Sequence, residues 1–131
     1  MSVELTMLLY SAALLLALVI FQAVAGVRAQ GLMPLANSRD GLPAPTNFHA
    51  RMLRVVDNHR EGLTIFAPIV LVAAFVDVST PMTVLGAQLF FYSRVAHAIV
   101  YILGLPLIRP LIWGVGIAGT ALVLLSTLGL I

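Results

Sequence analysis

The sequence predicts an all-α protein: an integral membrane four-helix bundle with up-down topology. The chain has 131 residues, of which 61% are hydrophobic and only 9% are charged, and its mean hydropathy is +1.09. A soluble domain of this size could not keep so much apolar surface out of water. The chain also contains four long apolar runs. Helices of this length form one compact bundle, so residues 1–131 are predicted to be a single domain.

The first apolar run, residues 5–27, is predicted to be a retained transmembrane helix. No basic segment precedes it, since Glu4 is acidic, and its length of about 23 residues exceeds the apolar part of a signal peptide. Residues 28–45 follow, and their Gly, Pro, Asn and Asp residues are typical of a loop.

The second helix is predicted over residues 46–76, where Thr46 or Asn47 can cap its start. A helix of about 30 residues is about 45 Å long, whereas the hydrocarbon core of a bilayer needs only about 20 residues. The first ten or so residues are therefore expected to project beyond the membrane or to lie in its interface.

The third and fourth helices are predicted over residues 82–103 and 110–130. Pro81 and Pro110 suit the first turns of these helices, where the missing N–H is not needed. The fourth helix contains a Gly-x-Gly-x-x-Gly pattern at 114–119. No strand precedes it, so the pattern predicts close helix packing rather than a dinucleotide loop.

Charge and cysteine content exclude several classes of function. The formal charge of +2 is too small to indicate a nucleic-acid partner, and the absence of cysteine excludes disulfides and thiolate metal sites. No metal site is predicted. The first and third connections and their flanks carry every basic residue except Arg94, whereas Glu4 and Asp77 lie on the opposite side. The positive-inside rule then places both termini outside and the longer connections in the cytoplasm.

A polar stripe leads into the second helix. Its members are spaced by three, four and three residues, which places them on one side of a helix: Arg51, Arg54, Asn58 and Glu61. The apolar part of the helix follows directly. Such a stripe is costly to bury and so indicates a specific role.

Arg94 lies in the third helix, roughly 18 Å from its outer end at 1.5 Å per residue. An unpaired Arg at that depth costs at least about 2.5–3.5 kcal/mol, so Arg94 is predicted to face the bundle interior and to have a partner. Glu61 lies at a matching depth. His97 and Tyr101 share the face of Arg94 because they follow it by three and seven residues.

Two interpretations of these residues remain open. In the first, Arg94 and Glu61 form a buried ion pair that fixes the register of the helices. In the second, the residues line a cavity that opens to the cytoplasm and binds an anionic ligand, with Arg28, Arg51, Arg54 and Arg109 at its mouth. Arg28 and Arg109 also suit simple anchoring in the membrane interface, and so do the histidines His49 and His59.

The pattern Arg51-x-x-Arg54-x-x-x-Asn58-x-x-Glu61, then an apolar helix, then Ser-Arg-Val-Ala-His-Ala-Ile-Val-Tyr at 93–101, resembles the MAPEG family. These are membrane-associated proteins in eicosanoid and glutathione metabolism, and the chain is similar to their bacterial members. The resemblance implies a homotrimer in the inner membrane. It also implies three sites at subunit interfaces, each binding glutathione as a co-substrate from the cytoplasmic side, without a metal.

The resemblance also implies roles for individual residues. Arg109 and Arg28 would be catalytic, because a cation beside the sulfur of glutathione raises its thiolate fraction. Arg94 would be a structural charge inside the bundle. The residues that would bind glutathione, whose carboxylates suit the paired donors of Arg, are Arg51, Arg54, Asn58, Glu61, His97 and Tyr101.

Three residues depart from the pattern of glutathione-using members. Asp57 stands where another Arg is common, and an acid there repels a carboxylate or pairs with an Arg meant for it. Pro110 and Trp113 stand where the prostaglandin synthase type has Ser and Tyr, so neither offers a hydroxyl.

The predicted function is that of a membrane-bound glutathione transferase or peroxidase that acts on lipophilic electrophiles. Its predicted partners are further copies of itself, membrane lipids and a lipophilic small molecule. The three departures favour an alternative, a non-catalytic trimeric scaffold or lipid-binding protein that has lost glutathione use. A small transporter is a weaker alternative, because four unbroken helices offer little for alternating access.

Overall fold

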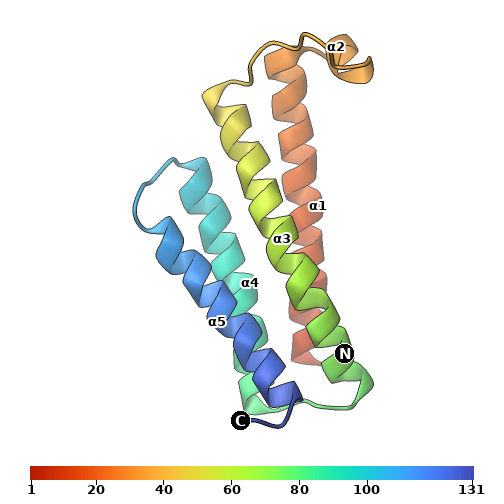
Figure 1. Cartoon of the computed structure of the whole chain (residues 1–131), viewed down its shortest axis with the longest axis vertical. Coiled ribbons are helices and arrows are strands. Elements are labelled where there is room, and N and C mark those ends of the chain that lie inside the picture. Colours follow the sequence, from red (N-terminus) through yellow and green to blue (C-terminus); the bar gives the residue numbers. More distant parts are fainter.

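The computed structural model describes residues 1–131 and confirms the all-α prediction. Its helices are α1 (Val3–Gln30), α2 (Leu32–Ala36), α3 (Asn47–Phe75), α4 (Pro81–Ile102) and α5 (Arg109–Thr127). The four long helices run up and down, with α1 packed on α3 and α4 packed on α5 (Figure 1). The two ends of the chain lie at the same end of the bundle (Figure 1).

The short helix α2 lies within the segment that was predicted to be a loop, so the structure has five helices rather than four. Gly31 ends α1 with a φ of 86°, a conformation that glycine adopts without strain. Pro34 then lies in the first turn of α2, where its missing N–H costs nothing. This explains how a segment with loop residues still forms one helical turn.

Two of the helices, α1 and α5, are long and apolar enough to cross a membrane. Helices α3 and α4 are also long, but they contain the polar stripe of α3 and the Arg94 and His97 side chains of α4. The most apolar helices of the bundle are thus the first and the last.

The helix starts follow from local residues. The Thr46 side chain accepts a hydrogen bond from the backbone N–H of His49, 3.2 Å away, and so caps α3 as predicted. Helix α4 begins with a capping box between Thr80 and Thr83, and Pro81 occupies its first turn.

Helices α4 and α5 pack closely because glycines face each other across their contact. A methyl group added at Gly86 would lie 2.5 Å from the carbonyl oxygen of Gly119, and one at Gly119 would lie 2.5 Å from that of Gly86. Gly116 also faces the bundle, whereas Gly114 faces open space. The packing role predicted for the glycine pattern therefore holds for Gly116 and Gly119 and not for Gly114.

The core consists of two clusters at different heights. Toward the chain ends, a cluster joins all four long helices: Met7, Phe66, Val70, Ala87, Phe90 and Val123. The rings of Phe66 and Phe90 stack there with centroids 3.9 Å apart. Toward the α2 end, a second cluster joins only α1, α3 and α4: Leu18, Ala25, Met52, Val55, Val56 and Ala98. Helix α5 does not contribute to this second cluster, and the candidate site lies beside it.

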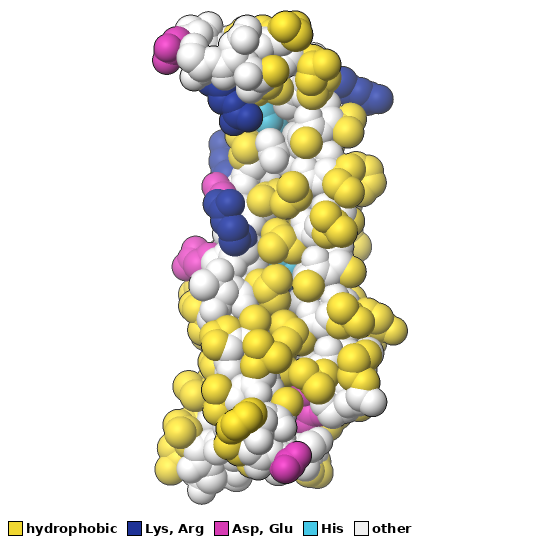
Figure 2. Space-filling model, turned by 90° about the vertical axis from the view of Figure 1, so that its right-hand side faces the viewer, with side chains coloured by type: hydrophobic (Ala, Val, Ile, Leu, Met, Phe, Trp, Pro, Cys, Tyr) yellow, Lys and Arg dark blue, Asp and Glu magenta, His cyan; other side chains and the backbone are white.

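The charged side chains are unevenly distributed along the bundle. On the face shown in Figure 2, the Arg side chains gather in the half that contains α2. Glu4 and Asp77 belong to the opposite half, at the start of α1 and after the end of α3. The two ends of the molecule thus differ in charge, as the sequence predicted.

Candidate functional site

A cavity of about 490 Å³ lies where α4 ends and α5 begins. Its lining residues are Asn58, His97, Tyr101, Leu107, Arg109, Pro110 and Trp113. The volume lies within the range of about 300–1,000 Å³ that is typical of ligand pockets. The structure thus brings together four of the predicted site residues, from α3, α4 and α5. We call this space the Arg109 cavity.

The ring of Tyr101 holds Arg109 in place. His97 and Tyr101 lie one turn apart on α4, and their ring centroids are 5.4 Å apart. The Cζ atom of Arg109 lies over the Tyr101 ring, 4.5 Å from its centroid, which is a cation–π contact. No side-chain acceptor in the chain binds this guanidinium, so its N–H groups are available to a ligand.

Arg94 faces the bundle interior as predicted, but its partner differs from the predicted one. Its side chain is only 2% exposed, and its Nη1 donates a hydrogen bond to Asn58 Oδ1 at 2.7 Å. The predicted ion pair with Glu61 is not formed, since Glu61 is exposed and the chain's one ion pair joins Arg60 to Asp57. The predicted depth of Arg94, level with the polar part of α3, agrees with its bond to Asn58. The prediction that Glu61 faces Arg94 does not hold, because Glu61 points to the outside of the chain.

The polar stripe of α3 is divided between two directions. Residues seven apart lie almost in line on a helix, so Arg51 and Asn58 form one row, and Arg54 and Glu61 form another. The first row is half-buried, whereas the second is exposed on the outside of the chain. Of the four residues, only Asn58 lines the Arg109 cavity. The Nε atom of Arg51 is buried without a partner.

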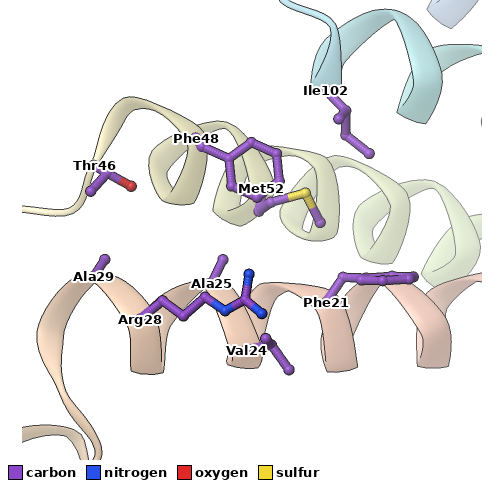
Figure 3. Close-up of a pocket in the computed structure, with 9 residues that line it drawn as sticks. All are labelled: Phe21, Val24, Ala25, Arg28, Ala29, Thr46, Phe48, Met52 and Ile102. Atoms are coloured by element: carbon purple, nitrogen blue, oxygen red, sulfur yellow. The ribbon is translucent and has the colours of Figure 1, made fainter.

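Arg28 lies in a different pocket, between α1 and the start of α3 (Figure 3). This pocket has a volume of about 460 Å³, and most of its lining is apolar: Phe21, Val24, Ala25, Ala29, Phe48, Met52 and Ile102, with Thr46. Arg28 is its only charged residue. The two predicted catalytic residues, Arg28 and Arg109, therefore do not meet within one chain.

Asp57, the acid that departs from the glutathione-binding pattern, lies outside the cavity. Its Oδ1 accepts from Nη2 of Arg60 at 2.5 Å, and both side chains are about two-thirds exposed, at 66% and 64%. Asp57 therefore engages Arg60 rather than a residue that lines the Arg109 cavity.

His49 and His59 were predicted to be interface residues, but the structure buries both side chains between helices. Each is 3% exposed, and both lie between α3 and α1. The Nε2 of His59 donates to the Ser11 carbonyl oxygen at 2.8 Å, and the side-chain amide of Gln22 lies 3.4 Å from the Nε2 of His49. Both histidines share the buried side of α3 with Met52, Val56 and Phe66, and this spacing was visible in the sequence.

Two glycines beside Arg94 were not predicted as part of the site. Gly62 follows Asn58 by one turn on α3, and Gly116 lies on α5. Each of them faces the Arg94 guanidinium so closely that a side chain there would press against it. For Gly62, the signal in the sequence was its position four residues after Asn58 of the polar stripe.

Comparison with known proteins gives one result. The model of the MAPEG family matches residues 6–129, which is almost the whole chain. No curated protein and no solved structure gives a match.

Proposed function

Because the chain belongs to the MAPEG family, we propose that it is a membrane enzyme that uses glutathione to conjugate lipophilic electrophiles or to reduce lipophilic hydroperoxides. The observation that carries this proposal is the position of Arg109. Its guanidinium rests on Tyr101 in a cavity that Asn58 and His97 also line. A positioned cation and polar side chains beside an open volume suit a small anionic co-substrate.

The proposed chemistry rests on Arg109. The thiolate is the reactive form of a thiol, and a neighbouring cation increases its population at neutral pH. Tyr101 fixes the guanidinium from one side, so that its N–H groups point toward the bound sulfur. Asn58 and His97 then bind polar groups of the peptide, and Trp113 forms the apolar wall that an electrophile contacts.

A single chain fits glutathione only in part. Glutathione has two carboxylates, but Arg109 is the only Arg that lines the cavity. Arg28, Arg51, Arg54 and Glu61 lie outside it. We therefore propose a homotrimer in which each site lies between two subunits and the neighbouring subunit supplies the missing cations.

The outer side of α3 supports this assembly. Arg54, Asp57, Arg60 and Glu61 are all exposed there, and charged side chains that face lipid cost several kcal/mol each in the membrane interior. A second subunit that covers this side removes the charges from lipid and can pair them.

The proposed location is the inner membrane, with the Arg109 cavity facing the cytoplasm and both termini outside. The gathering of Arg side chains at the α2 end supports this orientation, because basic residues are enriched on the cytoplasmic side of membrane proteins.

Isothermal titration of the detergent-solubilised protein with millimolar glutathione tests the proposal, together with an assay of conjugation to 1-chloro-2,4-dinitrobenzene. We expect binding, and turnover at neutral pH that Arg109→Ala strongly reduces. Arg39→Ala is the matched control, because Arg39 is exposed and donates only to the Leu35 carbonyl. Absence of binding heat, or equal turnover by Arg109→Ala, would sink the proposal.

The pocket around Arg28 favours a second candidate, a lipid-binding scaffold without catalysis. An apolar pocket with one cation suits an acyl chain with an acidic head group. Lipid extracted from the purified protein would then be enriched in anionic species, and Arg28→Ala would reduce that enrichment. Under this candidate Arg109→Ala has no effect on any thiol reaction, which separates it from the first.

A further inference from the structure

The Arg94 guanidinium occupies a slot between α3 and α5. A methyl group at Gly62 would lie 3.3 Å from its Cζ, and one at Gly116 would lie 2.6 Å from its Nη2. The Phe90 ring closes a third side, with its centroid 5.3 Å from Cζ. Two glycines and a ring thus leave this guanidinium little freedom to move.

Arg94 has one polar contact within the chain. Its Nη1 donates to Asn58 Oδ1, while its Nε and Nη2 are buried without a partner. A guanidinium can only donate hydrogen bonds. The amide of Asn58 must therefore turn its oxygen toward Arg94, and its NH₂ group is left to face elsewhere.

Asn58 also lines the Arg109 cavity, whereas Arg94 does not. We propose that Arg94 is a positioning residue for this cavity, because it fixes the Asn58 amide with the NH₂ group toward the ligand. Asn58 is then a donor to the ligand rather than an acceptor. The group that binds opposite Asn58 is accordingly an acceptor, a carboxylate or a peptide carbonyl.

This inference rests on the proposed function only for the identity of the ligand, glutathione. The contact between Arg94 and Asn58, and the orientation that follows from it, belong to the chain itself. The contact can therefore be tested both with glutathione and without it.

Asn58→Asp separates positioning from mere stability. A carboxylate of nearly the same shape keeps the bond to Arg94 and adds an opposite charge, but it has no donor for the ligand. We expect the Tm of the full-length protein to stay the same or rise. The Kd for glutathione should rise about tenfold to a hundredfold, as for a lost hydrogen bond to a charged group. An unchanged Kd would overturn the inference.

Gly116→Ala tests the slot. The new methyl group would lie 2.6 Å from Nη2 of Arg94 and 2.7 Å from Oγ of Ser93, so it displaces the guanidinium from the position in which it binds Asn58. The KM for glutathione should then rise several-fold while kcat at saturating glutathione changes little, because Arg109 is untouched. Gly114→Ala is the control on the same helix, since no atom lies within 4 Å of its new methyl group. Equal KM values for the two variants would contradict the slot.

A thermal double-mutant cycle tests the contact without ligand. It compares the Tm losses of Arg94→Met, Asn58→Leu and the double variant, in the full chain in detergent. If the Tm loss of the double variant differs from the sum of the two single losses, Arg94 and Asn58 are coupled. If it equals that sum, the inference is overturned. If the wild-type protein binds no glutathione, the proposed function fails while this cycle still decides whether Arg94 holds Asn58.

Discussion

The guanidinium of Arg109 lies 4.5 Å above the ring of Tyr101. Tyr101 is in the last turn of α4, and Arg109 is the first residue of α5. The contact therefore spans the connection between the two helices and fixes the cation at the edge of the cavity. The contact is made by the ring of Tyr101. Substitutions can therefore distinguish a role of the ring from a role of the hydroxyl.

Tyr101→Phe and Tyr101→Leu distinguish these roles. The Phe variant keeps the aromatic face under Arg109, whereas the Leu variant removes a contact of about 0.5–2 kcal/mol. We expect kcat/KM for glutathione conjugation to fall several-fold in Tyr101→Leu and to change little in Tyr101→Phe. Equal losses in both variants would show that the hydroxyl, not the ring, is required.

The dependence of conjugation on pH should change when Arg109 is removed. A cation beside the sulfur lowers the thiol pKa, so Arg109→Ala raises that pKa toward the ordinary value of about 8.5. The variant should lose rate at neutral pH and regain part of it as the pH rises, because more thiolate then forms. Stopped-flow rates across pH check this, and a profile identical to that of the wild type would exclude thiolate stabilisation by Arg109.

The glycine contact between α4 and α5 predicts a stability effect. Gly86→Ala places a methyl group 2.5 Å from the Gly119 backbone oxygen, and backbone atoms cannot move aside as a flexible side chain does. We expect a loss of about 1–3 kcal/mol, the usual cost of overpacking, seen as a lower Tm in detergent. Gly114→Ala, in open space, should keep or raise the wild-type Tm, because Ala favours a helix more than Gly does.

Glu4 predicts a second stability effect at the opposite end of the bundle. Its buried Oε1 accepts from the hydroxyls of Thr83 and Ser79, which joins the start of α1 to the start of α4. Ser79→Ala removes one donor to Glu4 and leaves the capping box of Thr80 and Thr83 intact, so it should cost about 1 kcal/mol, without altering the Kd for glutathione. Thr64→Val, an exposed change whose hydroxyl bonds only to its own helix, is the control. A Tm loss equal in both variants would contradict a role for Glu4.

Much of the fold could be predicted because apolar runs and capping residues are local signals. The runs indicated all four long helices, and Thr46 and Pro81 indicated helix starts that the structure confirms. The short helix α2 was missed because its Gly and Pro neighbours are also typical of a loop. The burial of the two histidines was not predicted, although their spacing places them on the side of α3 that carries Met52, Val56 and Phe66.

The site was harder to predict because matched depth does not fix direction. Glu61 and Asn58 lie three residues apart, and both are level with Arg94 and its neighbours. Which of them reaches Arg94 depends on the crossing of α3 and α4 and on the space that Gly62 and Gly116 leave. Neither can be obtained from spacing along one helix. The separation of Arg28 from Arg109 has the same origin, since it depends on how the helix pairs are arranged.

The division of the α3 stripe also has a genetic consequence. Asn58 serves the cavity of its own chain, whereas Arg54 and Glu61 point away from it. In the proposed trimer, a defect at Asn58 disables the site in cis, and a defect at Arg54 or Glu61 disables a neighbour's site in trans. Two inactive alleles, one of each kind, should therefore complement each other when they are expressed together. Every mixed trimer would contain one site with both halves intact.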